Sequence, residues 1–143
     1  MRTSAKAFLD TNIFVYAHDA ADPRKQPRSR ELIREQAASG LGVVSTQVMQ
    51  DFFSAATRKL GIDPLAAKEI LATFSVFEIV QVSPDLILEA IDSVVTHRIS
   101  FWDSLLVAAA ARAGCAVLYT EDLQSGRILR GITVRNPLTA NHT

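Results

Sequence analysis

Short apolar runs alternate along the chain with longer segments in which apolar residues recur every three or four positions. Apolar runs of up to about eight residues, bounded by polar or turn-forming residues, are typical of buried strands. The run at residues 77–82 also alternates between apolar and polar positions, as half-buried strands do. We predict strands at residues 7–9, 43–44, 77–82, 116–119 and 132–134.

The segments with helical spacing begin at capping residues or near a proline, and the first two of them end at glycines. Pro27 lies near the start of a helix that buries Leu32 and Ile33 and stops at Gly40. Thr46 is the expected cap of a strongly amphipathic helix that runs up to a glycine at position 61. Its expected apolar stripe consists of Val48, Phe52, Ala56 and Leu60, widened by Met49 and Phe53.

Three further helices follow. Asp63-Pro64 and Ser83-Pro84 each place a cap before a proline, which is a favourable first helical residue, and Ser100 opens an alanine-rich helix over 101–113. The expected buried residues of the helix after Asp63 are Ile70, Leu71 and Phe74. Those of the helix after Ser83 are Ile87, Ile91, Val94 and Val95.

This alternation of strands and helices predicts a single domain over residues 1–143, in which residues 136–143 form a polar tail. Strands joined by helices imply crossover connections, and therefore a three-layer α/β/α sandwich with a mainly parallel central sheet. In such sheets the ligand crevice lies beyond the carboxyl ends of the strands.

The charge balance argues against long-range attraction of nucleic acid. Lys and Arg number 15, as do Asp and Glu, so the net charge is zero and any nucleic acid must be held by local patches. The candidate patch consists of Arg24, Lys25, Arg28, Arg30 and Arg34, although a solvated helix face explains most runs of this kind.

The lone Cys115 excludes an internal disulfide, suits a reducing compartment and is interpreted as a small buried hydrophobe. The longest apolar run, 105–111, is too short to cross a bilayer. We therefore expect a cytoplasmic protein.

Four aspartates lie where the crevice is expected. Asp10 and Asp122 follow apolar strands, while Asp51 and Asp103 lie near the starts of two helices. Each has a purely structural alternative. Ser100 and Asp103 fit a capping box, and an aspartate after a strand readily forms a turn. Asp51 is harder to explain in this way, because Asp is a poor helix-interior residue.

Four motifs, in order along nearly the whole chain, resemble those of the PIN-domain nucleases, and more narrowly of the VapC toxins of bacterial toxin–antitoxin modules. They are FLDTNIFVYA at 8–17, STQVMQDF at 45–52, SFWDSLLVAAA at 100–110 and YTEDL at 119–123. In the last of them, Glu121 is an alternative to its neighbour as the functional acid, and Asp122 matches the family pattern better.

The resemblance implies a metal-dependent endoribonuclease that hydrolyses phosphodiester bonds of RNA. Its acids would line one pocket, at the positions of Asp10, Asp51, Asp103 and Asp122. By the same resemblance, Asn12 and Thr120 would be polar supports for these acids or their water. VapC-like toxins also form homodimers and are silenced by a cognate antitoxin, so the resemblance implies both partners.

The chemistry of the acids agrees with this resemblance. Carboxylates that are forced together raise one another's pKa unless a cation neutralises them, and oxygen ligands suit Mg²⁺ or Mn²⁺. A group of Cys and His residues that would favour zinc is missing, since Cys115, His18, His97 and His142 are scattered. In this hypothesis Asp10 is the central ligand, Asp103 and Asp122 bind metal or orient water, and Asp51 is a second-site ligand or a general base.

Two alternatives stay open at this point. The family pattern usually has Glu where this chain has Asp51, so a PIN-like module that binds a partner or RNA without cutting it is one of them. The other is a phosphotransferase with Asp10 as an aspartyl-phosphate nucleophile. That chemistry usually places a second acid two residues further on, where this chain has Asn12.

Overall fold

The structure is a computed structural model that describes residues 5–139, and within this range the strands form one six-stranded sheet. The strand order is β3-β2-β1-β4-β6-β5. All neighbours are parallel except β5 and β6, which form an antiparallel edge. The strands are β1 (Ala7–Leu9), β2 (Gly42–Ser45), β3 (Glu78–Val80), β4 (Val117–Tyr119), β5 (Ile128–Leu129) and β6 (Ile132–Arg135).

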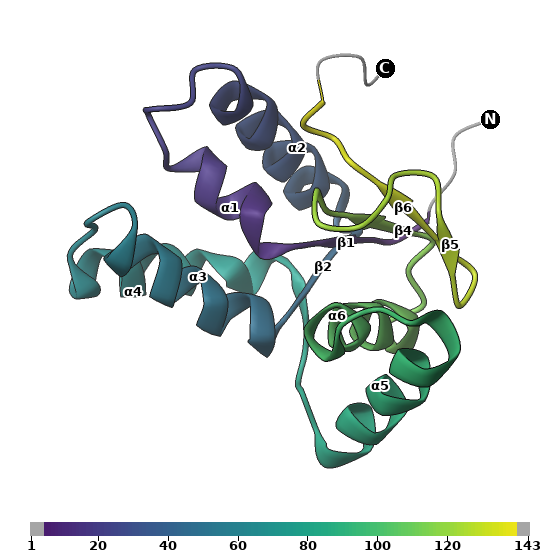
Figure 1. The fold of residues 1–143 in the computed structure, drawn as a ribbon. Coiled ribbons are helices and arrows are strands. Elements are labelled where there is room, and N and C mark those ends of the chain that lie inside the picture. Colours follow the sequence, from purple (N-terminus) through teal and green to yellow (C-terminus); the bar gives the residue numbers. More distant parts are fainter. Residues whose placement is uncertain (1–4, 140–143) are drawn as a thin grey trace.

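Helices cover both faces of the sheet (Figure 1). Helices α1 and α2 lie on one face and α5 and α6 on the other, while α3 and α4 extend together beyond the end of β2. This arrangement confirms the predicted α/β fold with a mainly parallel sheet. The helices are α1 (Thr11–Ala17), α2 (Lys25–Ser39), α3 (Thr46–Arg58), α4 (Pro64–Ala72), the 3₁₀ helix η1 (Thr73–Val76), α5 (Pro84–His97) and α6 (Phe101–Arg112).

Two elements, α1 and β5, were not predicted. The short helix α1 contains three β-branched residues in its seven and is separated from β1 by Asp10 alone, so its local sequence signal is weak. Tertiary packing stabilises it, because Ile13, Phe14 and Ala17 are buried against the core. The two-residue strand β5 is too short to produce a periodic pattern. The helix predicted after Asp63 includes Phe74, and in the structure it divides into α4 and the 3₁₀ helix η1.

The prediction for the buried face of α5 was wrong. Ile87, Ile91 and Val95 are exposed, whereas the buried residues of this helix are Leu86, Ala90 and Ser93. Helix α5 packs against the alanine-rich α6, and small side chains allow two helices to approach closely. The larger apolar side chains of α5 are therefore left on the outside.

Ser45, and not Thr46, caps helix α3. The Ser45 hydroxyl accepts a hydrogen bond from the Val48 N–H at 3.3 Å. The Thr46 hydroxyl instead accepts one from the Val82 N–H at 3.1 Å, which ties the segment after β3 to the start of α3. Both contacts fix the point at which α3 leaves the sheet.

Phenylalanines fill the space between α1, α3 and η1. The rings of Phe14 and Phe74 lie 4.5 Å apart, and those of Phe52 and Phe74 lie 5.9 Å apart. Tilted and edge-on pairs of this kind add to the energy of area burial. Phe52 is fully buried and follows Asp51 directly, so this cluster sets the rotation of α3 and hence the direction of the Asp51 side chain.

The predicted polar tail lies partly outside the described residues, which end at Thr139. Pro137 and Leu138 are buried, and the Pro137 carbonyl accepts a hydrogen bond from Arg28 Nε at 3.1 Å. Cys115 is buried too, and burial raises the pKa of its thiol to about 12. Among residues 5–139, no helix is both long and apolar enough to cross a membrane.

The adjacent phenylalanines of α3 offer a test of its rotation. Phe52→Ala should lower the free energy of unfolding by about 3–5 kcal/mol, because it opens a cavity in the core. Phe53 is 40% exposed, and Phe53→Ala should cost about 1 kcal/mol. Urea unfolding of both variants measures the difference, and equal losses would contradict this placement of α3.

Candidate active site

The site lies where the direction of the sheet's connections reverses. The chain proceeds from β1 outward to β2 and β3, and later returns to β4 on the other side of β1. Ligand crevices in parallel sheets form at such switch points. Leu9 is in register with Tyr119, so Asp10 and Thr120 leave their strands side by side, and the Asp10 N–H donates to the Tyr119 carbonyl at 3.0 Å.

Asp10 is a buried carboxylate held at both oxygens. Its Oδ1 accepts a hydrogen bond from the Thr11 N–H at 2.6 Å, which caps helix α1, and its Oδ2 accepts one from the Thr120 hydroxyl at 2.7 Å. The same Thr120 oxygen accepts a hydrogen bond from the Asp122 N–H at 3.1 Å. One threonine hydroxyl therefore links the two acids that follow β1 and β4.

Burial dominates the ionisation of Asp10. Loss of solvent raises its pKa to about 7, and the nearby charge of Asp122 acts in the same direction. The hydrogen bonds from Thr120 and Thr11 favour the ionised form and only partly oppose this rise. The molecule thus keeps a carboxylate in a place where a negative charge is unfavourable.

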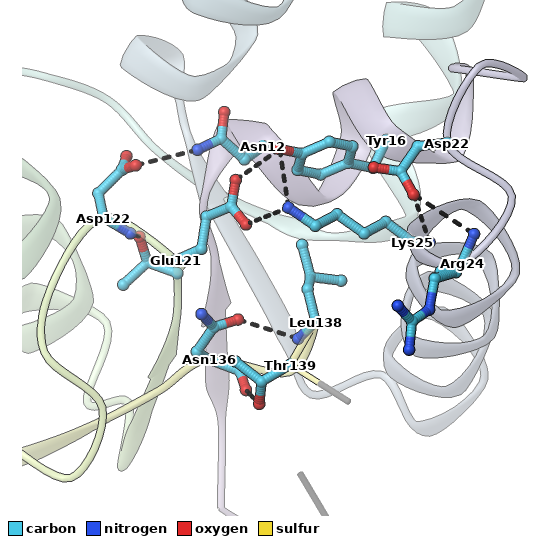
Figure 2. Close-up of polar contacts among 11 residues, drawn as sticks. Asn12, Tyr16, Asp22, Arg24, Lys25, Glu121, Asp122, Asn136, Leu138 and Thr139 are labelled. Carbon is cyan, nitrogen blue, oxygen red and sulfur yellow. Dashed lines mark hydrogen bonds and ion pairs between the residues drawn. The ribbon is translucent and has the colours of Figure 1, made fainter. Parts of the chain in front are cut away.

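Asp122 is exposed and is oriented by Asn12, whose Nδ2 donates to its Oδ1 at 3.1 Å (Figure 2). Asn12 and Thr120 therefore make the contacts expected of polar supports, one to each of the strand-end acids.

Glu121 points away from Asp122, into a separate network with α1 and α2 (Figure 2). The Tyr16 hydroxyl donates to Glu121 Oε1 at 2.7 Å, and Lys25 Nζ donates to Oε2 at 3.1 Å. The Lys25 ammonium also donates to the Tyr16 hydroxyl at 3.2 Å and lies over the tyrosine ring. This network fixes the loop after β4, and it leaves Asp122 rather than Glu121 facing the site.

Asp103 combines a place in the site with a place in a helix cap. The Ser100 hydroxyl accepts a hydrogen bond from the Asp103 N–H at 3.0 Å, which is half of the capping box. The reciprocal bond from the Ser100 N–H to the Asp103 carboxylate is not made among the described residues. Burial and the charge of Asp122 raise the pKa of Asp103, opposed by the Ser100 hydroxyl.

Asp51 borders the same site from α3. Desolvation alone raises its pKa, with no resolved influence from another carboxylate. The distinction is physical, because Asp122 affects both Asp10 and Asp103 through its charge. Asp10, Asp103 and Asp122 form an electrostatically connected group, and Asp51 faces this group from the opposite helix.

All four acids line one cleft of about 530 Å³. The same cleft contains residues that the sequence analysis did not single out, namely Gln47, Arg58, Lys59 and Trp102. For the residues of α3 and its C-cap the sequence signal is helical spacing, since position 47 lies four residues before 51, and 58 and 59 lie about two turns after it. Trp102 directly precedes Asp103. The Arg58 and Lys59 side chains form no ion pair with any described residue.

The predicted basic patch of α2 is largely engaged in internal contacts. Lys25 pairs with Glu121, Arg28 pairs with Glu31 at 2.6 Å, and Arg30 Nε donates to the Ala17 carbonyl at 2.7 Å. The cations that border the cleft are instead Arg58 and Lys59.

The comparison with protein families decides the relationship. A model of the PIN domain matches residues 7–128, which is most of the chain. The chain belongs to the PIN-domain family. No curated protein sequence matches it at a significant level.

Solved structures with the same fold are VapC toxins and their complexes. VapC20 of Mycobacterium tuberculosis, a sarcin-ricin loop cleaving toxin, is 24% identical, with a TM-score of 0.67 over 82% of this chain and 90% of that one. A toxin–antitoxin complex from Klebsiella pneumoniae is 16% identical, with a TM-score of 0.67 over 92% and 98% of the two chains. DNA-bound VapBC from Salmonella typhimurium is 16% identical, with a TM-score of 0.66 over 93% of this chain and 98% of that one. At these identities the similarity concerns the fold.

PIN domains generally depend on a metal ion, and the donor atoms of this cleft suit one. The acids offer only oxygen ligands, which hard divalent cations prefer, and a cation would offset the cost of burying the Asp10 charge. Among residues 5–139, no three acidic, His or Cys side chains are already close enough to hold an ion jointly. The acids that line the cleft are the residues that would hold such an ion.

The raised pKa of Asp10 predicts a pH dependence of stability without metal. Between the unfolded pKa of about 4 and the folded value of about 7, the folded state binds more protons, so stability should fall as the pH rises through this window. Asp10→Asn should remove part of this fall, on the order of a few kcal/mol. Urea unfolding in EDTA across the window measures it, and parallel profiles for the two proteins would refute the assignment.

Proposed function

We propose that this PIN domain is a metal-dependent endoribonuclease that hydrolyses phosphodiester bonds of RNA, and that it is the toxin of a toxin–antitoxin pair. One observation carries the proposal: Asp10, Asp51, Asp103 and Asp122 come from four separate parts of the chain and border a single cleft. A structural role as caps or turns would not require them to meet.

Each acid has a proposed role that follows from its surroundings. Asp10 is the central ligand, because it is buried and fixed at both oxygens. Asp103 and Asp122 are further ligands or orient water, and Asp51, on the facing helix, is a second-site ligand or a general base. Bound Mg²⁺ or Mn²⁺ would supply a water of lowered pKa and neutralise charge that develops on the phosphate.

The two cations of the cleft support a polyanionic substrate. Arg58 and Lys59 lie at the end of α3, about two turns beyond Asp51, and both are exposed. Lys and Arg side chains hold phosphates without reading sequence, and so position the strand across the acids. The lack of ion-pair partners among the described residues leaves both free for this role.

Cleavage of RNA with Mg²⁺ or Mn²⁺ tests the proposed function. Asp10→Asn should lower the rate by at least about a hundredfold, because it removes the central charge while it keeps the shape. Asp51→Glu, which restores the usual family residue, should retain or raise the rate. Glu69→Gln, which neutralises an exposed acid of α4 outside the cleft, is the matched control and should leave the rate unchanged.

Gel analysis with sequencing of the cut sites measures these rates. Full metal-dependent cleavage by Asp10→Asn would contradict the assignment. If metal ions stabilised the fold but RNA of many different sequences stayed uncut, the alternative of a module that binds without cutting would be favoured instead.

An antitoxin is the proposed protein partner. The support comes from relatives of this fold: the Klebsiella structure is a toxin–antitoxin complex, and VapBC from Salmonella typhimurium and VapBC2 from Rickettsia felis were crystallised with DNA. We expect the cognate antitoxin to suppress cleavage, which the same assay tests with and without that protein.

A homodimer is proposed because α5 exposes a row of apolar side chains. Leu88 is 62% exposed and Val95 is 76% exposed, and Ile87 and Ile91 lie near them on the same helix. Apolar patches of this kind on a soluble protein commonly mark an interface.

Light scattering at micromolar concentration should therefore give the mass of a dimer for the unmodified protein. Val95→Lys should give the mass of a monomer, because a charge would be buried without a partner. Leu65→Lys replaces an equally exposed apolar residue on α4 and should leave the dimer intact. A monomeric mass for the unmodified protein would refute this part of the proposal.

A further inference from the structure

Trp102 is an exposed aromatic side chain at the cleft. It is the single tryptophan of the chain, it is 65% exposed, and it lies directly before Asp103 at the start of α6. A large aromatic ring is costly to leave in water, so its place beside the acids needs an explanation.

The indole of Trp102 is supported on one side. The Phe101 ring contacts it edge-on, with centroids 5.1 Å apart and an interplanar angle of 72°. Phe101 itself is half-buried against the core. A ring held in this way loses little conformational freedom when another flat ring stacks on it.

Gln47 lines the same cleft and has a buried side-chain oxygen with no hydrogen-bond partner among the described residues. Its side chain is 6% exposed, and its Nε2 donates to the Trp102 carbonyl at 3.2 Å. This bond fixes the amide, because the opposite orientation would bring two oxygens together. The Oε1 atom is buried and accepts no hydrogen bond from any described residue. A buried acceptor without a donor costs free energy, so a ligand donor would be favoured there.

We propose that Trp102 and Gln47 form a nucleotide subsite, in which the indole stacks on one unpaired base and Gln47 Oε1 accepts a hydrogen bond from a ribose 2′-hydroxyl. The inference rests on the proposed function and names how the substrate is recognised. Stacking on an aromatic ring tolerates any base, whereas the 2′-hydroxyl distinguishes RNA from DNA. The subsite therefore selects single-stranded RNA with an unstacked base, next to Asp103.

Because Trp102 is the single tryptophan, its fluorescence reports this subsite directly. The Asp10→Asn protein, in EDTA, keeps the RNA intact during titration with single-stranded octamers of A, of C and of U. We expect saturable quenching with all three. An octamer with abasic riboses throughout should leave the fluorescence unchanged.

Affinity is measured separately by the anisotropy of labelled octamers, since Trp102→Leu abolishes the intrinsic signal. Trp102→Leu should weaken binding at least about tenfold through the lost stacking. Phe53→Leu removes an exposed aromatic ring of α3 that does not line the cleft, and should leave the affinity unchanged. Equal affinities of Trp102→Leu and the parent, or no quenching by any octamer, would overturn the proposal.

Gln47→Met tests the acceptor, because methionine has nearly the same shape and lacks the amide oxygen. The parent should bind the RNA octamer more tightly than the DNA octamer, and Gln47→Met should lose most of this ratio while quenching persists. A general loss of stability would weaken both nucleic acids alike, so an unchanged ratio would overturn the role of Gln47. Cleavage by the unmodified protein is scored independently, so failure of this subsite and failure of the nuclease assignment are distinguishable.

Discussion

The hydrogen bond from the Thr120 hydroxyl to Asp10 is the interaction on which the site depends. A buried carboxylate is tolerated only when its oxygens are satisfied, and Asp10 meets this condition with the Thr120 hydroxyl and the Thr11 N–H. Because the same hydroxyl accepts a hydrogen bond from the Asp122 N–H, it also fixes the loop after β4. The pairing of β1 with β4 therefore creates the acidic centre as a direct consequence of strand register.

The other two acids reach this centre through helix starts. Ser45 caps α3 and Ser100 caps α6, and each cap sets where its helix leaves the sheet. The phenylalanine cluster beneath α3 then fixes its rotation, so that Asp51 faces the cleft while Phe52 is buried. The geometry of the site thus depends on apolar packing as much as on polar contacts.

Much of this could be predicted from the sequence because it depends on local patterns. The short apolar runs, the caps before proline and the acids after strands all have signals within a few residues. The buried face of α5 has no such local signal. Leu86, Ala90 and Ser93 are buried by contact with α6, which no property of α5 alone reveals. A pattern of large apolar residues identified the wrong face, since the tightest helix contacts use the smallest side chains.

The same limit applies to the cleft. Glu121 and Asp122 are adjacent in sequence, and only the contacts of Glu121 with Tyr16 and Lys25 separate their roles. The basic run of α2 was the candidate phosphate patch by composition, yet Lys25, Arg28 and Arg30 make contacts within the fold. Long-range contacts of this kind decide which charges remain available to a ligand.

A chain without net charge can still bind a polyanion if its charges are distributed unevenly within one cleft. Here the acids lie around Asp10, while Arg58 and Lys59 lie further along α3 and Trp102 lies at the start of α6. Phosphates that approach the cations would be repelled by the acids unless a metal ion neutralised them. The acidic centre would then contribute to substrate binding only when it is loaded with metal, which couples the two binding events through electrostatics alone.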